Sequence, residues 1–370
     1  MQQISSFGFL VVAFVASAIC GLLTIPIVLD FCKEKGLYDI PDKRKVHTAA
    51  IPRLGGITFL PSVLIGCVVA VILANMTNTQ EVTLGLWTVY FGIGLSAIYM
   101  VGLFDDLFGV GPKVKLAVQL LAACMLPVSG LWLNNLYGLF GINELPFWIG
   151  APLTVLVVAF ISNAINLIDG IDGLSGSLTF IALAGFAWFF ARWELGYYVV
   201  GIVAFMGIIA AYLYFNLFGS VEKNRKIFMG DTGSLSIGFM LAFLSLKVSM
   251  NNEYVMPFSG TGFLLALTVL LIPTFDVFRV AIVRLRHHRS PMAADKNHIH
   301  HKLMRTGLSA HGTLVAIILI ELSFILLNIL LSQTVSLTWT VVADIVVYIA
   351  MHYTIDTIIR HKNNEPLVFE

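Results

Sequence analysis

Residues 7–31 read FGFLVVAFVASAICGLLTIPIVLDF, an apolar run in which Asp30 is the single charged side chain. About 20 apolar residues are enough to cross the hydrocarbon core of a bilayer as an α-helix. The run follows no basic segment, and no small-residue cleavage site closes it. It therefore predicts a retained membrane helix and not a signal peptide.

Ten further apolar runs of similar length follow, and their length predicts helices that cross the membrane. The expected spans are residues 7–31, 55–75, 83–103, 113–132, 148–167, 174–191, 195–217, 232–247, 261–283, 312–331 and 335–354. The expected fold is an all-α polytopic membrane protein with about 11 transmembrane helices, in which residues 1–370 form a single integral-membrane domain.

The composition indicates that lipid is the main solvent of this chain. Hydrophobic residues make up 58% of it, charged residues 12%, and the mean hydropathy is +0.90. Soluble domains carry roughly 25% charged residues, so a soluble globular enzyme, a disordered scaffold and a secreted disulfide framework are excluded. The cysteines show no paired spacing and are expected to be reduced packing residues. They are Cys20, Cys32, Cys67 and Cys124.

The distribution of basic residues sets the expected orientation. Of the 22 Lys and Arg residues, all except Arg192 and Lys247 fall in or beside the loops after odd-numbered spans, or in the C-terminal tail. Basic residues concentrate on the cytoplasmic side of membrane proteins. The N-terminus is therefore expected outside and the C-terminus in the cytoplasm. The expected cytoplasmic loops are about residues 32–54, 104–112, 168–173, 218–231 and 284–311.

The first of four polar clusters on these loops is the pair Asp105 and Asp106, followed by Lys113 and Lys115. Two adjacent carboxylates repel each other unless a cation or a proton is shared between them. Carboxylates are also unfavourable at the C-terminal end of a helix dipole. The pair therefore favours a functional site, with a solvated helix end as the alternative.

The second cluster lies in NAINLIDGIDGLSG, residues 163–176. Asn163, Asn166 and Asp169 recur three residues apart, so they share one face if the fifth span stays helical this far. Asp172 follows, and the neighbouring glycines let the backbone approach a ligand closely. A capped turn between helices is the alternative.

The third cluster is FMGDTGS, residues 228–234, at the start of the eighth span. Asp231 or Thr232 can cap this helix. A helix N-terminus flanked by glycines is also an anion site, and a carboxylate beside it can hold the metal ion that accompanies phosphates.

The fourth cluster is PMAADKNHIHHKLMRTG, residues 291–307, with His298, His300 and His301 followed by Arg305. Clustered histidines suggest a zinc or nickel site, but no Cys or Glu stands at a spacing that completes it. The surrounding Lys and Arg residues favour a polyanionic ligand. The alternative for Arg279, Arg284 and Arg286 is contact with lipid headgroups. These residues are part of the same basic segment.

Together the clusters predict one site at the cytoplasmic face. Every even-numbered helix starts there, so its positive dipole end faces the same side. Carboxylates for a divalent cation, cations for phosphates and a lipid-facing wall indicate phosphoryl transfer between a nucleotide and a lipid. A transporter of a phosphorylated metabolite is the alternative, but its site would lie near the midplane between inverted repeats. Glu321 and Asp344 lie mid-span, as functional candidates or as a protonated or mutually bonded structural pair.

In this order, the acidic pair with its lysines, NAINLIDGIDGL, FMGDTGS and PMAADKNHIHH resemble the polyprenyl-phosphate N-acetylhexosamine-1-phosphate transferases. The HIHH form resembles the branch that uses undecaprenyl phosphate and UDP-GlcNAc to start O-antigen, common antigen or teichoic acid. The resemblance implies release of UMP, Mg²⁺ with Mn²⁺ as substitute, and a bacterial cytoplasmic (inner) membrane. A homodimer is also possible, and no nucleic-acid partner is expected. Another UDP-N-acetylhexosamine and UDP-MurNAc-pentapeptide remain alternative donors.

The resemblance and the clusters together predict the site residues. Asp231 and Asn166 hold the metal, and Asp105 and Asp106 act in catalysis, by proton transfer or through an aspartyl-phosphate. The expected substrate-binding residues are Lys113, Lys115, Asn163, Asp169, Asp172, Phe228, His298, His300, His301 and Arg305. The peptidoglycan branch uses a uracil-contacting Lys that has no Lys counterpart in HTAAIPRLGG, where His47 and Arg53 are the possible replacements.

Overall fold

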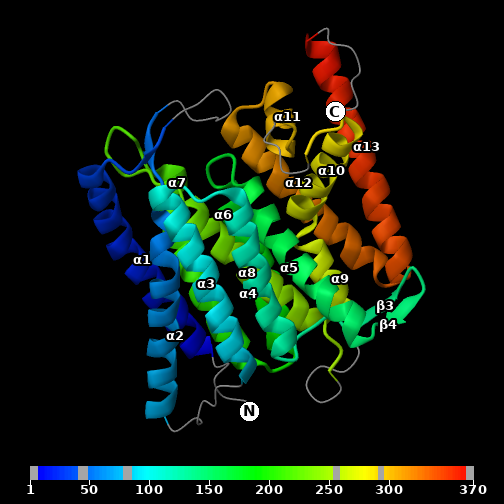
Figure 1. Ribbon diagram of the computed structural model, residues 1–370, viewed down its shortest axis with the longest axis horizontal. Helices are drawn as coiled ribbons and strands as arrows, with labels where there is room; N and C mark the ends of the chain where they lie inside the picture. The colour runs from blue at the N-terminus through cyan, green and yellow to red at the C-terminus, as the bar shows by residue number, and fades with distance from the viewer. Residues whose placement is uncertain (1–6, 41–48, 78–85, 253–258, 291–295, 364–370) are drawn as a thin grey trace.

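The computed structural model describes residues 7–40, 49–77, 86–252, 259–290 and 296–363. These residues form a bundle of long helices, joined on two of the loops by short antiparallel strand pairs (Figure 1). The helices are α1 (Phe7–Lys35), α2 (Phe59–Met76), α3 (Leu86–Phe108), α4 (Pro112–Val128), α5 (Phe147–Ile168), α6 (Leu174–Arg192), α7 (Gly196–Phe218), α8 (Gly230–Ser249), α9 (Gly260–Thr268), α10 (Leu271–Arg286), α11 (Ile299–Arg305), α12 (Ala310–Leu331) and α13 (Leu337–Asn363), with a 3-10 turn η1 (Gly55–Thr58).

A polytopic membrane fold is confirmed. Among the described residues, 9 helices are long and apolar enough to cross a membrane, and the bent pair α9–α10 brings the number to 10. The expected fourth span is α4, which has 17 residues. Helix α1 begins at the lower end of the bundle in Figure 1, and α13 ends at the upper end. The count of eleven and the orientation remain predictions.

The two strand pairs add to the expected all-α fold. Strands β1 (Tyr38–Asp39) and β2 (Ile51–Pro52) pair in the loop after α1. Strands β3 (Asn135–Leu139) and β4 (Ile142–Glu144) pair at the other end of the bundle (Figure 1). The first pair folds the loop after α1 back toward the start of α2, which brings Asp39 close to the clusters predicted above.

Helix α8 is the centre of the bundle. Every residue from Thr232 to Ser249 is buried, and the helix packs against α3, α5, α6 and α9. Close contact with α5 requires a glycine, because a Cβ at Gly238 would lie 2.6 Å from the Cα of Ser162. A helix enclosed on all sides is held by packing rather than by an amphipathic pattern. Its N-terminal residues are therefore fixed in position by the surrounding helices.

The expected ninth span is not one straight helix. It divides into α9 and α10, which meet at a bend of 65°. The break exposes the first backbone N–H groups of α10, and the buried Glu321 on α12 accepts a hydrogen bond from the N–H of Ile272 at 3.1 Å. Glu321 thereby stabilises the start of α10.

Asp344 has a different partner from Glu321. Its carboxylate accepts a hydrogen bond from Asn328 at 2.9 Å, and the same amide donates to the Thr268 hydroxyl at 2.9 Å. This contact joins α9, α12 and α13 inside the bundle. Among the described hydrogen bonds, Glu321 and Asp344 therefore do not form the mutual pair that was one of the two expectations.

Three apolar cores lie in the described part of the bundle. The largest runs through α1 to α9. A smaller core joins α10 to α13 to the ends of α5 and α6, and a third, minor cluster lies between α1, α2 and α7. The buried members of the smaller core include Ile168 and Ile171 beside the second polar cluster and Ile355 and Ile359 on α13. The C-terminal third of the chain is thus packed directly against the loop that carries Asp169.

Candidate active site

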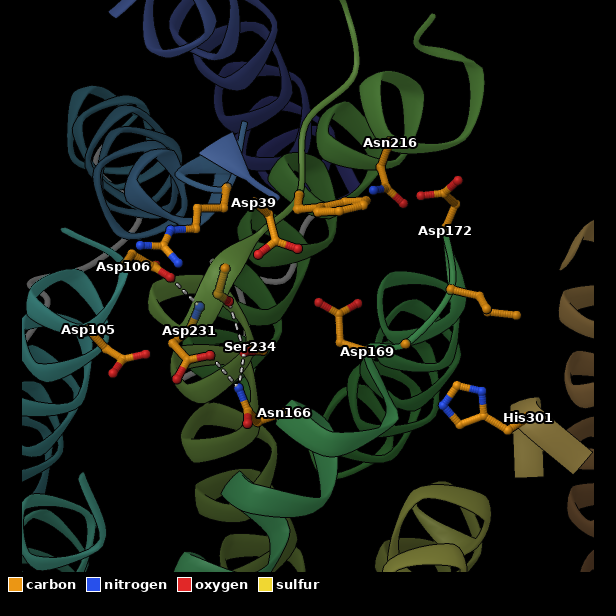
Figure 2. A pocket seen from close by; sticks show the side chains of 15 residues that line it. Asp39, Asp105, Asp106, Asn166, Asp169, Asp172, Asn216, Asp231, Ser234 and His301 are labelled. Carbon is orange, nitrogen blue, oxygen red and sulfur yellow. Dashed lines mark hydrogen bonds between the residues drawn. The ribbon is translucent and has the colours of Figure 1, made fainter. Parts of the chain in front are cut away.

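Three of the four predicted clusters line one cavity of about 370 Å³, and the fourth reaches it through His301 (Figure 2). The cavity lies where the C-terminal ends of α3 and α5 meet the N-terminal end of α8. Its lining residues are Asp39, Arg53, Asp105, Asp106, Asn166, Asp169, Gly170, Ile171, Asp172, Asn216, Phe228, Gly230, Asp231, Ser234 and His301. Six carboxylates on one cavity predict that a cation or a ligand with matching charge binds there.

Asp106 forms the N-terminal cap of α8 from a different helix. Its carboxylate accepts hydrogen bonds from the N–H of Asp231 at 2.9 Å, the N–H of Thr232 at 2.9 Å and the Thr232 hydroxyl at 2.6 Å. The expectation that Asp231 or Thr232 caps this helix is wrong, because the N-cap position is Met229 and no local side chain accepts. The close approach requires Gly230, where a Cβ would lie 2.5 Å from Asp106 Oδ2.

Asp105, Asp106 and Asp231 form a cluster that could hold a metal ion. Their ligand atoms lie within 4.8 Å of one another. The Lys115 ammonium lies beside two of them, 3.2 Å from Asp105 and 2.6 Å from Asp231. A cation is therefore already stabilised between these carboxylates, as their charge requires.

The donor atoms suit Mg²⁺, which prefers carboxylate and amide oxygens. Asn166 lies beside the same cluster, where its amide nitrogen donates to Asp231 at 3.0 Å and to the Ser234 hydroxyl at 2.8 Å, so its amide oxygen would have to turn toward the cluster to act as a ligand. Asp106 is already bonded to three donors of α8, so Asp105 and Asp231 have more free acceptor capacity. The carboxylates of Asp231 and Asp105 could therefore hold a divalent cation.

The second cluster is positioned differently from the expected single helix face. Helix α5 ends at Ile168, and Asp169 takes a non-helical conformation at the C-cap. Asn163 lies in the helix and donates to Gln119 at 2.5 Å, away from the cavity lining. Asn166 therefore faces the metal cluster while Asp169 points separately into the middle of the cavity (Figure 2).

The loops beside Asp169 are tied together by polar contacts. Lys226 pairs with Asp172 at 2.5 Å. The Asn216 side chain accepts from the N–H of Gly173 at 2.6 Å and donates to the carbonyl of Ile227 at 2.9 Å. Burial, together with the smaller effect of the charges of Asp172 and Asp231, raises the pKa of Asp169 to about 7. This carboxyl therefore gains or loses its proton near neutral pH.

The histidines occupy distinct positions on and before the short helix α11. His301 lines the cavity. His298 is buried and bonds through Nδ1 to the Asp276 carboxylate at 2.8 Å. His300 packs on the second cluster, since a Cβ at Gly170 would lie 2.2 Å from His300 Nε2. Burial lowers the pKa of His300 to about 3 and of His301 to about 4, so both are neutral at physiological pH.

The zinc or nickel alternative finds no support among the described residues. The aspartate cluster is the one group there with metal-binding spacing, and it contains no histidine. Asp276 has another role, because it also accepts from the N–H of Ile299 at 3.0 Å and from Arg279 at 2.9 Å. It orients His298 and the start of α11 together.

Helix α13 packs against α11 and fixes its position. Lys302, which is 1% exposed, forms an ion pair with Asp356. Further along, Lys362 donates to the carbonyl of Thr306 at 3.0 Å. Ile299 and Leu303 pack in the same core as Ile355 and Ile359. The positions of the histidines therefore depend on residues of α13, such as Asp356, that follow α11 by about 50 positions in the sequence.

Several predicted substrate-binding residues do not line the cavity. They are Lys113, Asn163, His298, His300 and Arg305, with Lys115 reaching the cluster through Asp105 and Asp231. Lys113 is exposed. His47 lies outside the described residues. Their roles in substrate binding remain predictions, while Phe228, Asp169, Asp172 and His301 do line the cavity.

The sequence reasoning missed some residues of the site. Asp39, Asn216 and Ser234 line the cavity, and Lys226 and Asp276 support it. Asn216 and Asp276 gave a usable signal, since each is a polar residue inside an expected span. Asp39 gave none, because its position depends on the pairing of β1 with β2.

An apolar cavity of about 360 Å³ lies between α5, α8, α9 and α10. Its walls are mostly Leu, Val, Ile and Phe side chains, including Leu153, Phe160, Phe263 and Phe278. The bend between α9 and α10 shapes one side of it, since Leu270 and Thr274 flank the break. Such a surface suits a hydrocarbon chain.

Comparison with known proteins agrees with this arrangement. The glycosyl transferase family 4 model matches residues 86–249, which include α3 to α8. A Bacillus subtilis protein named "Probable undecaprenyl-phosphate N-acetylglucosaminyl 1-phosphate transferase" is 32% identical over 95% of this chain and 94% of its own length. The undecaprenyl-phosphate alpha-N-acetylglucosaminyl 1-phosphate transferase of Escherichia coli K12 is 30% identical over 78% of this chain and 74% of its own length. The chain therefore belongs to glycosyl transferase family 4, a family of membrane sugar-1-phosphate transferases.

Proposed function

We propose that this protein transfers GlcNAc-1-phosphate from UDP-GlcNAc to undecaprenyl phosphate, which gives undecaprenyl-diphospho-GlcNAc and UMP. The observation that carries the proposal is the aspartate cluster around Lys115 at the N-terminus of α8, in a membrane protein that also encloses an apolar cavity between α5, α8, α9 and α10. The names of the relatives support the choice of sugar and lipid. The product would start a cell-surface polysaccharide such as O-antigen, common antigen or teichoic acid at the bacterial cytoplasmic membrane.

The reaction joins an oxygen of the lipid phosphate to the sugar-bound phosphorus of the donor. The bond from that phosphorus to the bridging oxygen breaks, and UMP leaves. Asp231, Asp105 and Asn166 would hold Mg²⁺, which neutralises the charge on the diphosphate and on the departing UMP. The lipid phosphate is mostly dianionic at neutral pH because its second pKa is near 6, so Asp105 contributes more by position than as a base.

Other residues at the cavity would bind the phosphates and the uracil ring. Lys115 supplies a fixed positive charge at the carboxylate cluster, and such preorganised charges stabilise a phosphoryl-transfer transition state. Phe228 presents an aromatic face to the cavity, where it can stack on the uracil ring. The apolar cavity between α5 and α10 provides room for the polyprenyl chain.

We propose the orientation with the cavity at the cytoplasmic face and the N-terminus outside. Single cysteines in a cysteine-free background test it, because a charged maleimide reaches only one side of intact cells. We expect Glu222→Cys, in the exposed loop after α7, to be protected, and Glu144→Cys, in the exposed strand β4, to be labelled. Labelling of Glu222→Cys together with protection of Glu144→Cys would reverse the proposed topology.

The purified protein should release UMP when UDP-GlcNAc, undecaprenyl phosphate and Mg²⁺ are all present. We expect UDP-GlcNAc to be preferred over UDP-MurNAc-pentapeptide, and Mn²⁺ to replace Mg²⁺. Excess EDTA should abolish release because the oxygen ligands need a divalent cation to bind a diphosphate. Full activity in EDTA, or a clear preference for the muramoyl donor, would contradict the proposal.

Substitutions of Asp231 and Asp105 should differ in their effects from a substitution of Asp106, which caps α8. Asp231→Asn and Asp105→Asn should each lower kcat about 100-fold or more, the scale for removing a group that stabilises transition-state charge, and Asp231→Asn should raise the Mg²⁺ concentration needed. Asp106→Asn should also lower the free energy of unfolding by about 1–3 kcal/mol, because its amide group meets the N–H donors of α8. Steady-state kinetics and thermal unfolding in detergent measure both effects. Normal turnover and metal dependence in Asp231→Asn would refute the metal assignment.

Stability without ligand should depend on the proton of Asp169. Its pKa is about 7 in the folded protein and about 4 in the unfolded chain, so folding favours the protonated form and stability falls as pH rises from 4 to 7. Asp169→Asn should therefore stabilise the protein at pH 8, by at most about 4 kcal/mol, and change little near pH 4.5. Thermal unfolding across this range tests it, with the exposed Asp30→Asn as control. An equal effect of Asp169→Asn at both pH values would contradict the assignment.

A further inference from the structure

Arg53 is the one Lys or Arg residue among those that line the active-site cavity. The basic side chains around the cavity are already paired. Lys115 contacts Asp105 and Asp231, and Lys226 contacts Asp172. Within the described part of the chain, no hydrogen bond or ion pair engages the Arg53 guanidinium, and its Nε is buried without a partner. An unpaired guanidinium at the wall of a cavity can bind an anionic ligand.

The backbone fixes Arg53 in this position. The segment Pro52–Gly56 pairs with the third cluster through three hydrogen bonds, from Phe228 N–H to the Pro52 carbonyl at 2.8 Å, from Gly55 N–H to the Phe228 carbonyl at 2.8 Å and from Gly56 N–H to the Met229 carbonyl at 2.9 Å. Both glycines are required, since a Cβ at Gly56 would lie 2.1 Å from the Gly233 nitrogen and a Cβ at Gly55 2.7 Å from the Phe228 carbonyl. The sequence PRLGG therefore delivers an arginine to the cavity on a rigid backbone.

Arg53 stands at the carboxylate end of the cavity. A Cβ at Gly230 would meet both the Arg53 carbonyl, at 2.2 Å, and Asp106 Oδ2, at 2.5 Å. Asp106 is committed to three donors of α8 and makes no ion pair with Arg53. The backbone of Arg53 thus lies beside the aspartate cluster, and its side chain lines the same cavity as Asp106.

We propose that Arg53 binds a phosphate group of a substrate, either in the nucleotide diphosphate or on the lipid. This inference rests on the proposed function for the identity of the ligand. A guanidinium offers two parallel N–H donors to phosphate oxygens, a geometry that an ammonium does not reproduce. It also adds positive charge to the cavity. Without that charge, the six carboxylates of the lining would repel two phosphorylated substrates.

The test compares Arg53→Met, which keeps length and removes charge, with Arg53→Lys, which keeps charge and removes the two-donor geometry. The control is Arg192→Met, because Arg192 is exposed at the far end of α6 and lies over the Trp188 ring at 5.7 Å. Initial rates give KM for UDP-GlcNAc and undecaprenyl phosphate, and competition gives Ki for UMP and for uridine. Uridine carries the base without phosphate and so reports contacts to uracil alone.

We expect Arg53→Met to weaken phosphate recognition about 10- to 100-fold, the range for losing a hydrogen bond to a charged group, and Arg53→Lys to recover part of the loss. A raised Ki for UMP identifies the nucleotide phosphate as the ligand. A raised KM for undecaprenyl phosphate with unchanged UMP inhibition identifies the lipid phosphate. Ki for uridine should stay within about twofold of wild type. The proposal is overturned if all four constants stay at wild-type values, or if uridine and UMP weaken by the same factor.

A separate measurement keeps this inference distinct from the proposed reaction. Pyrophosphate with Mg²⁺ should raise the melting temperature of the wild type and of Arg192→Met, and raise it much less in Arg53→Met. If the wild type released no UMP from UDP-GlcNAc, the proposed function would fail while this result still decided the role of Arg53. If Arg53→Met did not fold, Arg53→Gln would replace it. Equal pyrophosphate stabilisation of the variant and the wild type would overturn the inference.

Discussion

The hydrogen bonds from the α8 N-terminus to Asp106 are the constraint on which the rest of the site depends. The N–H of Thr232 at the start of α8 is buried among the surrounding helices, and an unpaired buried N–H costs about 1–3 kcal/mol. Asp106 accepts from this N–H, from the N–H of Asp231 and from the Thr232 hydroxyl. The same contact fixes Asp231 opposite Asp105 and leaves the positive end of the helix dipole facing the cavity.

This arrangement explains why two adjacent aspartates are needed at the end of α3. Asp106 faces α8 and is 3% exposed, so its charge is balanced by the helix N-terminus. Asp105 faces the cavity, where Lys115 and the N–H of Val110 contact it. Two carboxylates in sequence are electrostatically unfavourable alone, and the structure resolves the repulsion by giving each its own positive partner. The resulting cluster keeps enough negative charge to attract a divalent cation.

The sequence predicted the spans and the clusters, because hydropathy and the placement of polar residues are local properties. It could not predict features that depend on distant partners. Asp169 lies beyond the end of α5, the bend before α10 is stabilised by Glu321 from α12, and the cap of α8 comes from α3. The position of Arg53 depends on the pairing of Pro52–Gly56 with the segment around Phe228. No spacing rule within one segment encodes such contacts.

The aspartate cluster and the histidine segment belong to two different parts of the bundle, each with its own apolar core. The carboxylates and Lys115 lie on α3, α4 and α8, within the residues matched by the family model. The histidine segment follows α10 and is held by the smaller core and by the Lys302–Asp356 pair. His300 meets the catalytic part at Gly170. Because both His300 and His301 are neutral, these two imidazoles contribute shape and hydrogen bonding next to the cavity and add no positive charge of their own.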